Sequence, residues 1–186
     1  MKRGLLVLLL VCLLVCGCNK ITNKRILMVI APNDFKDEEL YIPKSLFEEE
    51  SFSVTITSSV KEAISAAGKK QKADILLKDA TTDYDALVFV GGPGAAVYFN
   101  NTSALNLVKK FYENNKVVGA ICLAPVILSK AGILNKKAAT VFPTEKNLLK
   151  GANYTGEAVT VDGNIVTGMD PDSAEEFAEE IIKLLK

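Results

Sequence analysis

The chain contains short runs that are densely apolar instead of alternating between apolar and polar residues. They cover Lys24–Ile30, Ala86–Val90 and Val117–Ile121. A strand of this kind is buried on both faces and needs helices above and below it, as in parallel sheets. Helical segments alternate with these strands, at about residues 37–50, 102–114, 124–131 and 170–185. The alternation predicts an α/β fold built on a mainly parallel central sheet.

Weaker patterns predict the remaining strands. Predicted strands also lie at residues 53–57, 74–77 and 138–141. Asp162-Gly163 separates two β-like runs and predicts a hairpin over Val159–Thr167. Residues 61–72 fit either a helix or a small excursion around Gly68, and residues 31–35 are expected to form a loop.

The ends of the predicted helices carry local signals. Thr102 or Ser103 is expected to cap the helix over residues 102–114, because a hydroxyl oxygen can accept from a free N–H of the first turn. Gly132 is expected to end the helix over residues 124–131. Asp170 and the proline that follows it are expected to open the last helix.

The first residues of the chain differ from the rest. Lys2 and Arg3 precede an apolar run, Gly4–Val15, which is followed by Cys16-Gly17-Cys18. A basic start, a short apolar core and a small-residue cleavage site are typical of a secretory signal peptide. The end of the run resembles a lipobox, in which Cys18 is lipidated and becomes the new N-terminus. The predicted division is into a signal peptide, a tether and a folded domain, at residues 1–18, 19–23 and 24–186.

An uncleaved apolar anchor is the alternative interpretation of this leader, although its core is shorter than the roughly 20 residues of a comfortable membrane span. Both interpretations predict an exported domain at the extracytoplasmic face of the membrane. They also assign Cys12, Cys16 and Cys18 to the leader. Cys122 is then the single cysteine of the mature domain, so no disulfide within that domain is possible.

Composition excludes several classes of function. Acidic and basic residues balance at 22 each, so charge provides no argument for a nucleic-acid partner. The chain contains no histidine, which excludes Cys–His and Ser–His–Asp catalytic sets. With one domain cysteine and no calcium-loop spacing of acidic residues, no metal site is predicted. The turn Gly91–Gly94 matches neither a dinucleotide fingerprint nor a phosphate loop, and no cofactor is predicted.

Cys122 directly follows the apolar run Val117–Ile121 and precedes small residues, a proline and a helix. This is the layout of a nucleophile on a strand-to-helix turn. The helix dipole and free N–H groups at that point would favour the thiolate. They could also hold an oxyanion, with the N–H groups of Gly92 and Leu123 as candidate donors. The alternative is an inert, buried thiol that packs as a small apolar residue.

The carboxyl ends of parallel strands meet at one edge of a sheet. The loop at 31–35, the Gly91–Gly94 turn and Cys122 should therefore gather there. Glu38 and Glu39 follow this loop and would by default form a solvated helix face. If one of them points into the crevice instead, its pKa would rise beside the thiol and it could act as the proton partner.

Motifs in the same order along the chain resemble the PfpI/DJ-one superfamily. They are Asp34–Pro43, Tyr84–Gly94 and Ala120–Pro125, and the later runs Asp162–Gly168 and Glu175–Ala178 fit as well. The resemblance covers about residues 24–185. It implies a flavodoxin-like three-layer sandwich and a homo-oligomer.

The same resemblance implies roles for individual residues. Cys122 matches the reactive elbow cysteine of the family, and Glu39 is similar to the glutamate that shares a proton with it. Glu38 is the weaker candidate for that position. Gly92 and Leu123 match the backbone oxyanion positions.

The chain departs from the family pattern at its histidines. Leu123 stands where protease-like members carry a histidine, and Phe142 stands where members of the DJ-one type carry one before a proline. Histidine-dependent peptidase activity is therefore not expected. Met169 and Asp170 stand where the family often has an arginine, which removes a cation near the crevice.

Different classes of function remain open at this point. In the first, Cys122 and Glu39 act on a small electrophilic carbonyl or a glycated group on a protein, as glyoxalases and deglycases of the family do. In the second, Cys122 is a non-catalytic thiol sensor of oxidants. In the third, the chain is a chaperone-like surface lipoprotein in which Cys122 is a relic.

Overall fold

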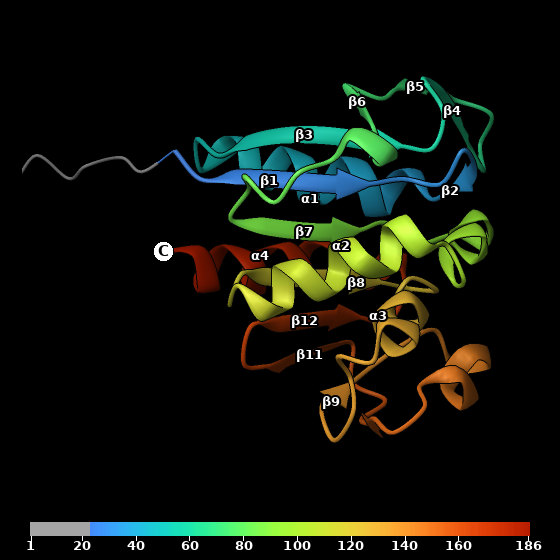
Figure 1. The fold of residues 1–186 in the computed structure, drawn as a ribbon, viewed down its shortest axis with the longest axis vertical. Coiled ribbons are helices and arrows are strands. Elements are labelled where there is room, and N and C mark those ends of the chain that lie inside the picture. The colour runs from blue at the N-terminus through green and yellow to red at the C-terminus, as the bar shows by residue number, and fades with distance from the viewer. Residues whose placement is uncertain (1–22) are drawn as a thin grey trace, which may run out of the picture.

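The computed structural model describes residues 23–186. They form three layers, with the main sheet between two layers of helices (Figure 1). The seven strands of this sheet lie in the order β11-β12-β8-β7-β1-β3-β6. All neighbouring pairs are parallel except β11 and β12, which form an antiparallel hairpin. The strands are β1 (Arg25–Val29), β3 (Ser53–Ser58), β6 (Ile75–Leu76), β7 (Ala86–Phe89), β8 (Val117–Ile121), β11 (Val159–Asp162) and β12 (Ile165–Gly168).

Helices cover both faces of this sheet. One face carries α1 and α4, which pack against each other, and the opposite face carries α2 and α3. The helices are α1 (Asp37–Glu49), α2 (Thr102–Glu113), α3 (Pro125–Ala131) and α4 (Ala174–Leu185). This arrangement confirms the predicted flavodoxin-like α/β sandwich with a mainly parallel central sheet.

The central strands are buried on both faces, as their composition predicts. Every residue of β7 and β8 is buried, and β1 exposes only Arg25. Gly119 of β8 lies directly under α4, where a Cβ atom would come within 2.9 Å of Phe177 Cζ and 2.8 Å of Ile181 Cδ1. The glycine therefore allows α4 to approach the sheet closely.

A second sheet contains β2 (Asn33–Phe35), β4 (Glu62–Ser65) and β5 (Lys70–Lys72). Of the two alternatives for residues 61–72, the helix is wrong, and the excursion around Gly68 is a β-hairpin. Residues 31–35 are not simply a loop, because β2 pairs in parallel with β4. A strand whose partner lies far away in the sequence leaves little local signal, and these strands are short and polar.

The remaining short elements lie outside the main sheet. β9 (Ala138–Ala139) pairs with β10 (Asn153–Tyr154) in a separate two-stranded sheet, so the strand predicted at 138–141 is shorter than expected. Within the main sheet, β11 and β12 confirm the hairpin predicted over Val159–Thr167. Short 3₁₀ helices lie at Leu77–Asp79, Pro93–Tyr98, Pro143–Leu148 and Pro171–Ser173.

The start of α2 differs from the prediction, and the end of α3 agrees with it. Asn101 is the N-cap of α2, and its Oδ1 accepts from Ala104 N–H at 3.0 Å. Thr102 and Ser103 lie inside the first turn, so the prediction that one of them is the cap is wrong. Gly132 ends α3 with a φ of 85°, in the left-handed region that favours glycine.

The predicted signal peptide, its lipobox and Cys18 lie outside the described residues. Within residues 23–186, no helix combines the length and the apolar character needed to cross a membrane. The described part of the chain enters the sheet through β1, an inner strand that begins at Arg25.

Asn101→Ala tests the corrected cap of α2. Loss of Oδ1 leaves the Ala104 N–H without its partner, so we expect the free energy of unfolding to fall by about 1 kcal/mol. Urea unfolding followed by circular dichroism measures the change. The matched control is Asn100→Ala, because Asn100 is exposed and precedes the cap. Equal losses in the two variants would contradict the assignment.

Candidate active site

Cys122 occupies a sharp turn between β8 and α3. Its φ is 62°, in a region that residues with a side chain rarely adopt. Two backbone hydrogen bonds hold it there: Cys122 N–H donates to Gly168 O at 3.0 Å, and Phe142 N–H donates to Cys122 O at 3.0 Å. Strain of this kind costs about 1–3 kcal/mol and persists only where the surroundings enforce it. The strand-to-helix turn expected from the sequence is therefore present, and the cysteine in it is only 4% exposed.

Glu39 lies in the first turn of α1 and is fully buried. Its Oε2 accepts from Gly91 N–H at 2.8 Å. Its Oε1 is buried without a partner of regular hydrogen-bond geometry in the described part of the chain. The Cys122 thiol nevertheless lies close enough to stabilise the carboxylate. Glu38 is exposed, so the structure brings Glu39 and not Glu38 to the cysteine.

Two glycines join the thiol and the carboxyl. A Cβ atom on Gly91 would lie 2.6 Å from Glu39 Oε2 and 2.8 Å from Cys122 Cβ, so any side chain there would push the pair apart. Gly92 has a φ of 93°, and a Cβ on it would collide with the backbone of the loop before α1. The N–H groups of Gly92 and Leu123 both face the Cys122 sulfur and stabilise its charged form.

The two buried groups share their protons. Burial raises the pKa of Glu39 to about 7, while hydrogen bonds from Cys122 and Gly91 limit the rise. Burial, followed by the charge of Glu39, raises the pKa of Cys122 to about 12. Between these values the pair holds one proton, and the thiolate forms when that proton moves to Glu39. The sequence predicted the direction of this shift but not its cause, because burial raises the carboxyl pKa and the contact with the thiol lowers it.

The pKa of the thiol corrects a different expectation, that the start of a helix favours the thiolate. Cys122 does not lie in the first turn, because α3 begins only at Pro125 and is seven residues long. Pro125 also has no N–H to donate. The N–H groups of Gly92 and Leu123 lower the pKa of Cys122, but burial outweighs them. The charge of Glu39 raises the pKa of Cys122 further, so within the pair the thiolate forms only when the thiol proton moves to Glu39.

Sequence reasoning did not identify the backbone contacts that complete the site. Lys36 N–H donates to Gly91 O at 3.3 Å, and the Lys36 charge favours the ionised form of Glu39. Gly168 and Phe142 hold the elbow through main-chain groups that any residue type could supply. Over residues 23–186, no group of three or more His, Cys, Asp or Glu side chains is arranged to hold a metal ion.

The buried carboxyl predicts how stability depends on pH. The native pKa of Glu39 is about 7, above its ordinary value of 4.5, so the native state binds this proton more tightly than the unfolded chain does. Its contribution to stability is fully present below about pH 4.5 and is lost as pH rises through about 7. Glu39→Gln removes this loss. Relative to the wild type, the variant should gain about 3 kcal/mol between about pH 4 and about pH 8.

Guanidinium unfolding of the two proteins at both pH values measures this gain. Glu38→Gln is the control, because Glu38 is exposed and precedes Glu39 directly. It should show no such trend. A Glu39→Gln variant with the same relative stability at both pH values would contradict the raised pKa.

Nearly all of the described part of the chain is similar in sequence to a known protein family. The DJ-1/PfpI family matches residues 24–184. An uncharacterised protein from Methanocaldococcus jannaschii is 45% identical over 171 residues, which cover 88% of this chain and 83% of the relative. A deglycase from Pyrococcus horikoshii is 31% identical over 163 residues, which cover 86% of this chain and 98% of the deglycase.

A solved structure supports the same relationship. The crystal structure of a ThiJ/PfpI domain protein from Brachyspira murdochii matches with a TM-score of 0.84 and 31% identity, and the match covers 87% of this chain and 95% of that one. The motif-based resemblance is thus confirmed by sequence and by fold. The chain belongs to the DJ-1/PfpI family.

Proposed function

We propose that this protein is a cysteine-dependent enzyme that acts on small reactive carbonyls or glycated groups, in a glyoxalase-like or deglycase-like reaction. The observation that carries the proposal is the pairing of the buried Cys122 thiol with Glu39, a carboxyl whose pKa is about 7. A group that titrates near the working pH is suited to accept and return a proton. The similarity to a deglycase from Pyrococcus horikoshii supports this class of substrate.

The reaction begins when Glu39 accepts the proton of the thiol. The Cys122 thiolate adds to the aldehyde carbon, so a carbon–sulfur bond forms and the π electrons of the carbonyl move to its oxygen. The N–H groups of Gly92 and Leu123 hold this oxyanion. Protonated Glu39 then returns its proton to the oxygen, which gives a neutral hemithioacetal and needs no co-reactant.

With an α-oxoaldehyde, the ionised Glu39 next removes the proton from the carbon that carries sulfur. The electrons pass to the neighbouring carbonyl oxygen, which takes the proton back from Glu39 and gives an enediol. Glu39 then moves the hydroxyl proton of the sulfur-bearing carbon to the neighbouring carbon, which gives a thioester. Water hydrolyses the thioester to the hydroxy acid and restores the thiol. One carboxyl serves every step, which is consistent with a chain that contains no histidine.

Turnover of methylglyoxal tests the proposal. The wild type should consume it and form lactate, and Cys122→Ser should abolish both. Glu39→Gln should slow turnover by about 10²- to 10⁴-fold, the usual contribution of a general acid–base. Glu38→Gln is the matched control and should retain the wild-type rate. A glycated peptide assayed in parallel separates the deglycase reaction, and activity on neither substrate would refute the proposal.

Redox sensing is the second candidate function. Cys122 is a free cysteine, and the residues that the structure describes contain no second cysteine to form a disulfide with it. Oxidation to the sulfenic and then the sulfinic acid is the remaining path. The N–H groups of Gly92 and Leu123 would stabilise the resulting anion. Mass spectrometry after mild peroxide should then show added oxygen at Cys122, and an unmodified thiol would count against this function.

We also propose that the protein is exported and held at the extracytoplasmic face of the membrane, through a lipidated Cys18 or an uncleaved leader. The support is the basic start and apolar run over residues 2–18. Release of a Cys18→Ser variant into the soluble fraction would distinguish the lipid from an apolar anchor. A homo-oligomer is proposed on the family resemblance alone. A chaperone-like role remains if Cys122→Ser leaves every activity unchanged.

A further inference from the structure

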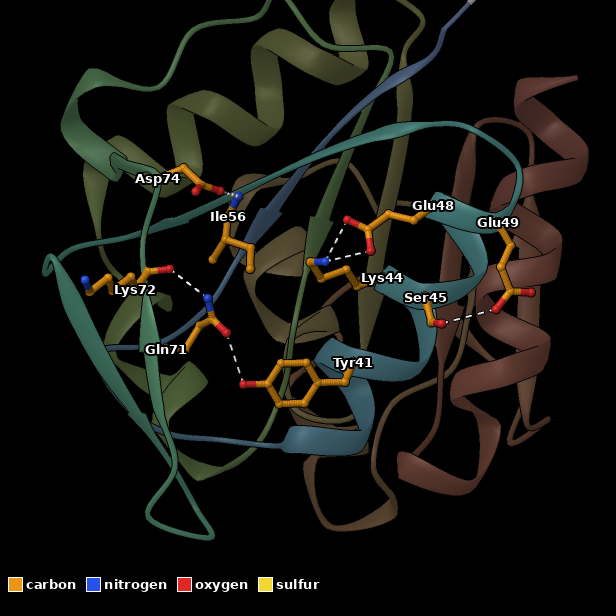
Figure 2. A network of polar contacts seen from close by, with 9 residues as sticks. All are labelled: Tyr41, Lys44, Ser45, Glu48, Glu49, Ile56, Gln71, Lys72 and Asp74. Atoms are coloured by element: carbon orange, nitrogen blue, oxygen red, sulfur yellow. Dashed lines mark hydrogen bonds and ion pairs between the residues drawn. The ribbon is translucent and has the colours of Figure 1, made fainter.

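Helix α1 is tied to the β4–β5 hairpin by side chains that the proposed chemistry does not use (Figure 2). Tyr41 O–H donates to Gln71 Oε1 at 3.0 Å. Gln71 Nε2 in turn donates to Lys72 O at 2.8 Å, which fixes the orientation of the amide. Lys69 Nζ lies 4.0 Å from the centroid of the Tyr41 ring, a cation–π contact. Tyr41 is only two residues beyond Glu39 in the same helix.

The hairpin also holds the segment that leads into α1. β2 pairs with β4, and Ala66 N–H donates to Phe35 O at 2.8 Å. Lys36, the next residue, donates its N–H to Gly91 O at 3.3 Å. Gly91 N–H donates to Glu39 Oε2 at 2.8 Å. The hairpin, the start of α1, the glycine turn and the buried carboxyl are therefore joined by one continuous series of contacts.

We propose that Tyr41, Lys69 and Gln71 are positioning residues that hold Glu39 opposite Cys122. This inference rests on the pair proposed above as the reacting groups. By fastening the hairpin to α1, the three side chains keep the start of the helix against the glycine turn, where the carboxyl is buried. Burial is the largest cause of the high proton affinity of Glu39, so a looser attachment would weaken its hold on the thiol proton.

The charges around the pair are separate from this attachment. Lys36 favours the ionised form of Glu39, Glu38 disfavours it, and Cys122 faces it from the elbow. Tyr41→Phe removes one hydroxyl and leaves the ring and all of these charges in place. A change in the pH profile of the thiol would therefore report the loss of attachment and not a change of charge.

The test measures the rate of Cys122 alkylation by iodoacetamide against pH, which needs no carbonyl substrate. In the wild type we expect a phase with a midpoint near pH 7, set by the pair. Tyr41→Phe and Gln71→Leu should each lower the alkylation rate in this phase by about two- to tenfold, which corresponds to the free energy of one hydrogen bond. The double variant should be no slower than the slower single variant, because both changes break the same bond.

Ser45→Ala is the matched control, because it removes only the exposed 3.2 Å hydrogen bond to Glu49 on the same helix (Figure 2). If the wild type shows the neutral-pH phase and Tyr41→Phe and Gln71→Leu leave it unchanged, the positioning role is overturned alone. If the wild type lacks the phase, the pair itself is overturned, and this inference with it.

Discussion

The burial of one carboxyl determines how the site is built. An isolated carboxylate away from water is costly, so Glu39 must be compensated or neutral. Gly91 N–H satisfies one oxygen, and the other lies beside the Cys122 thiol without a regular partner among the described groups. The contact requires a glycine at 91, because a Cβ there would meet both members of the pair. The start of α1 and the carboxyl ends of β7 and β8 are thereby drawn to a single point.

The strained cysteine depends on the same neighbourhood. Both backbone groups of Cys122 are occupied, its N–H by Gly168 at the end of β12 and its carbonyl by Phe142. The contact from Phe142 is made by its main-chain N–H, so it does not depend on the type of side chain at this position. The support that keeps Cys122 in its left-handed conformation is therefore separate from the side chains that carry protons.

The sequence predicted the elements whose signals are local. Densely apolar strands, the elbow at Cys122, the hairpin at Asp162-Gly163 and the end of α3 at Gly132 all follow from composition or from single residues. Contacts between distant segments were not predictable in this way. The β4–β5 hairpin is polar and short, and its pairing with β2 depends on the tertiary fold. The prediction that the thiolate is favoured was wrong for a related reason. Burial raises the pKa of Cys122, and burial depends on tertiary contacts that the spacing of residues along the chain does not show.

The number of protons limits what this site can do. Between about pH 7 and about pH 12 the pair holds one proton, and no imidazole is available to supply a second. Peptide hydrolysis has to activate a nucleophile and then protonate a poor amine leaving group, which histidine-dependent enzymes achieve with a mobile imidazole. Isomerisation of a hemithioacetal instead moves a proton between adjacent atoms within reach of one carboxyl. A buried Glu39 that titrates near neutrality fits the second requirement, which is the physical reason for proposing carbonyl chemistry at this site.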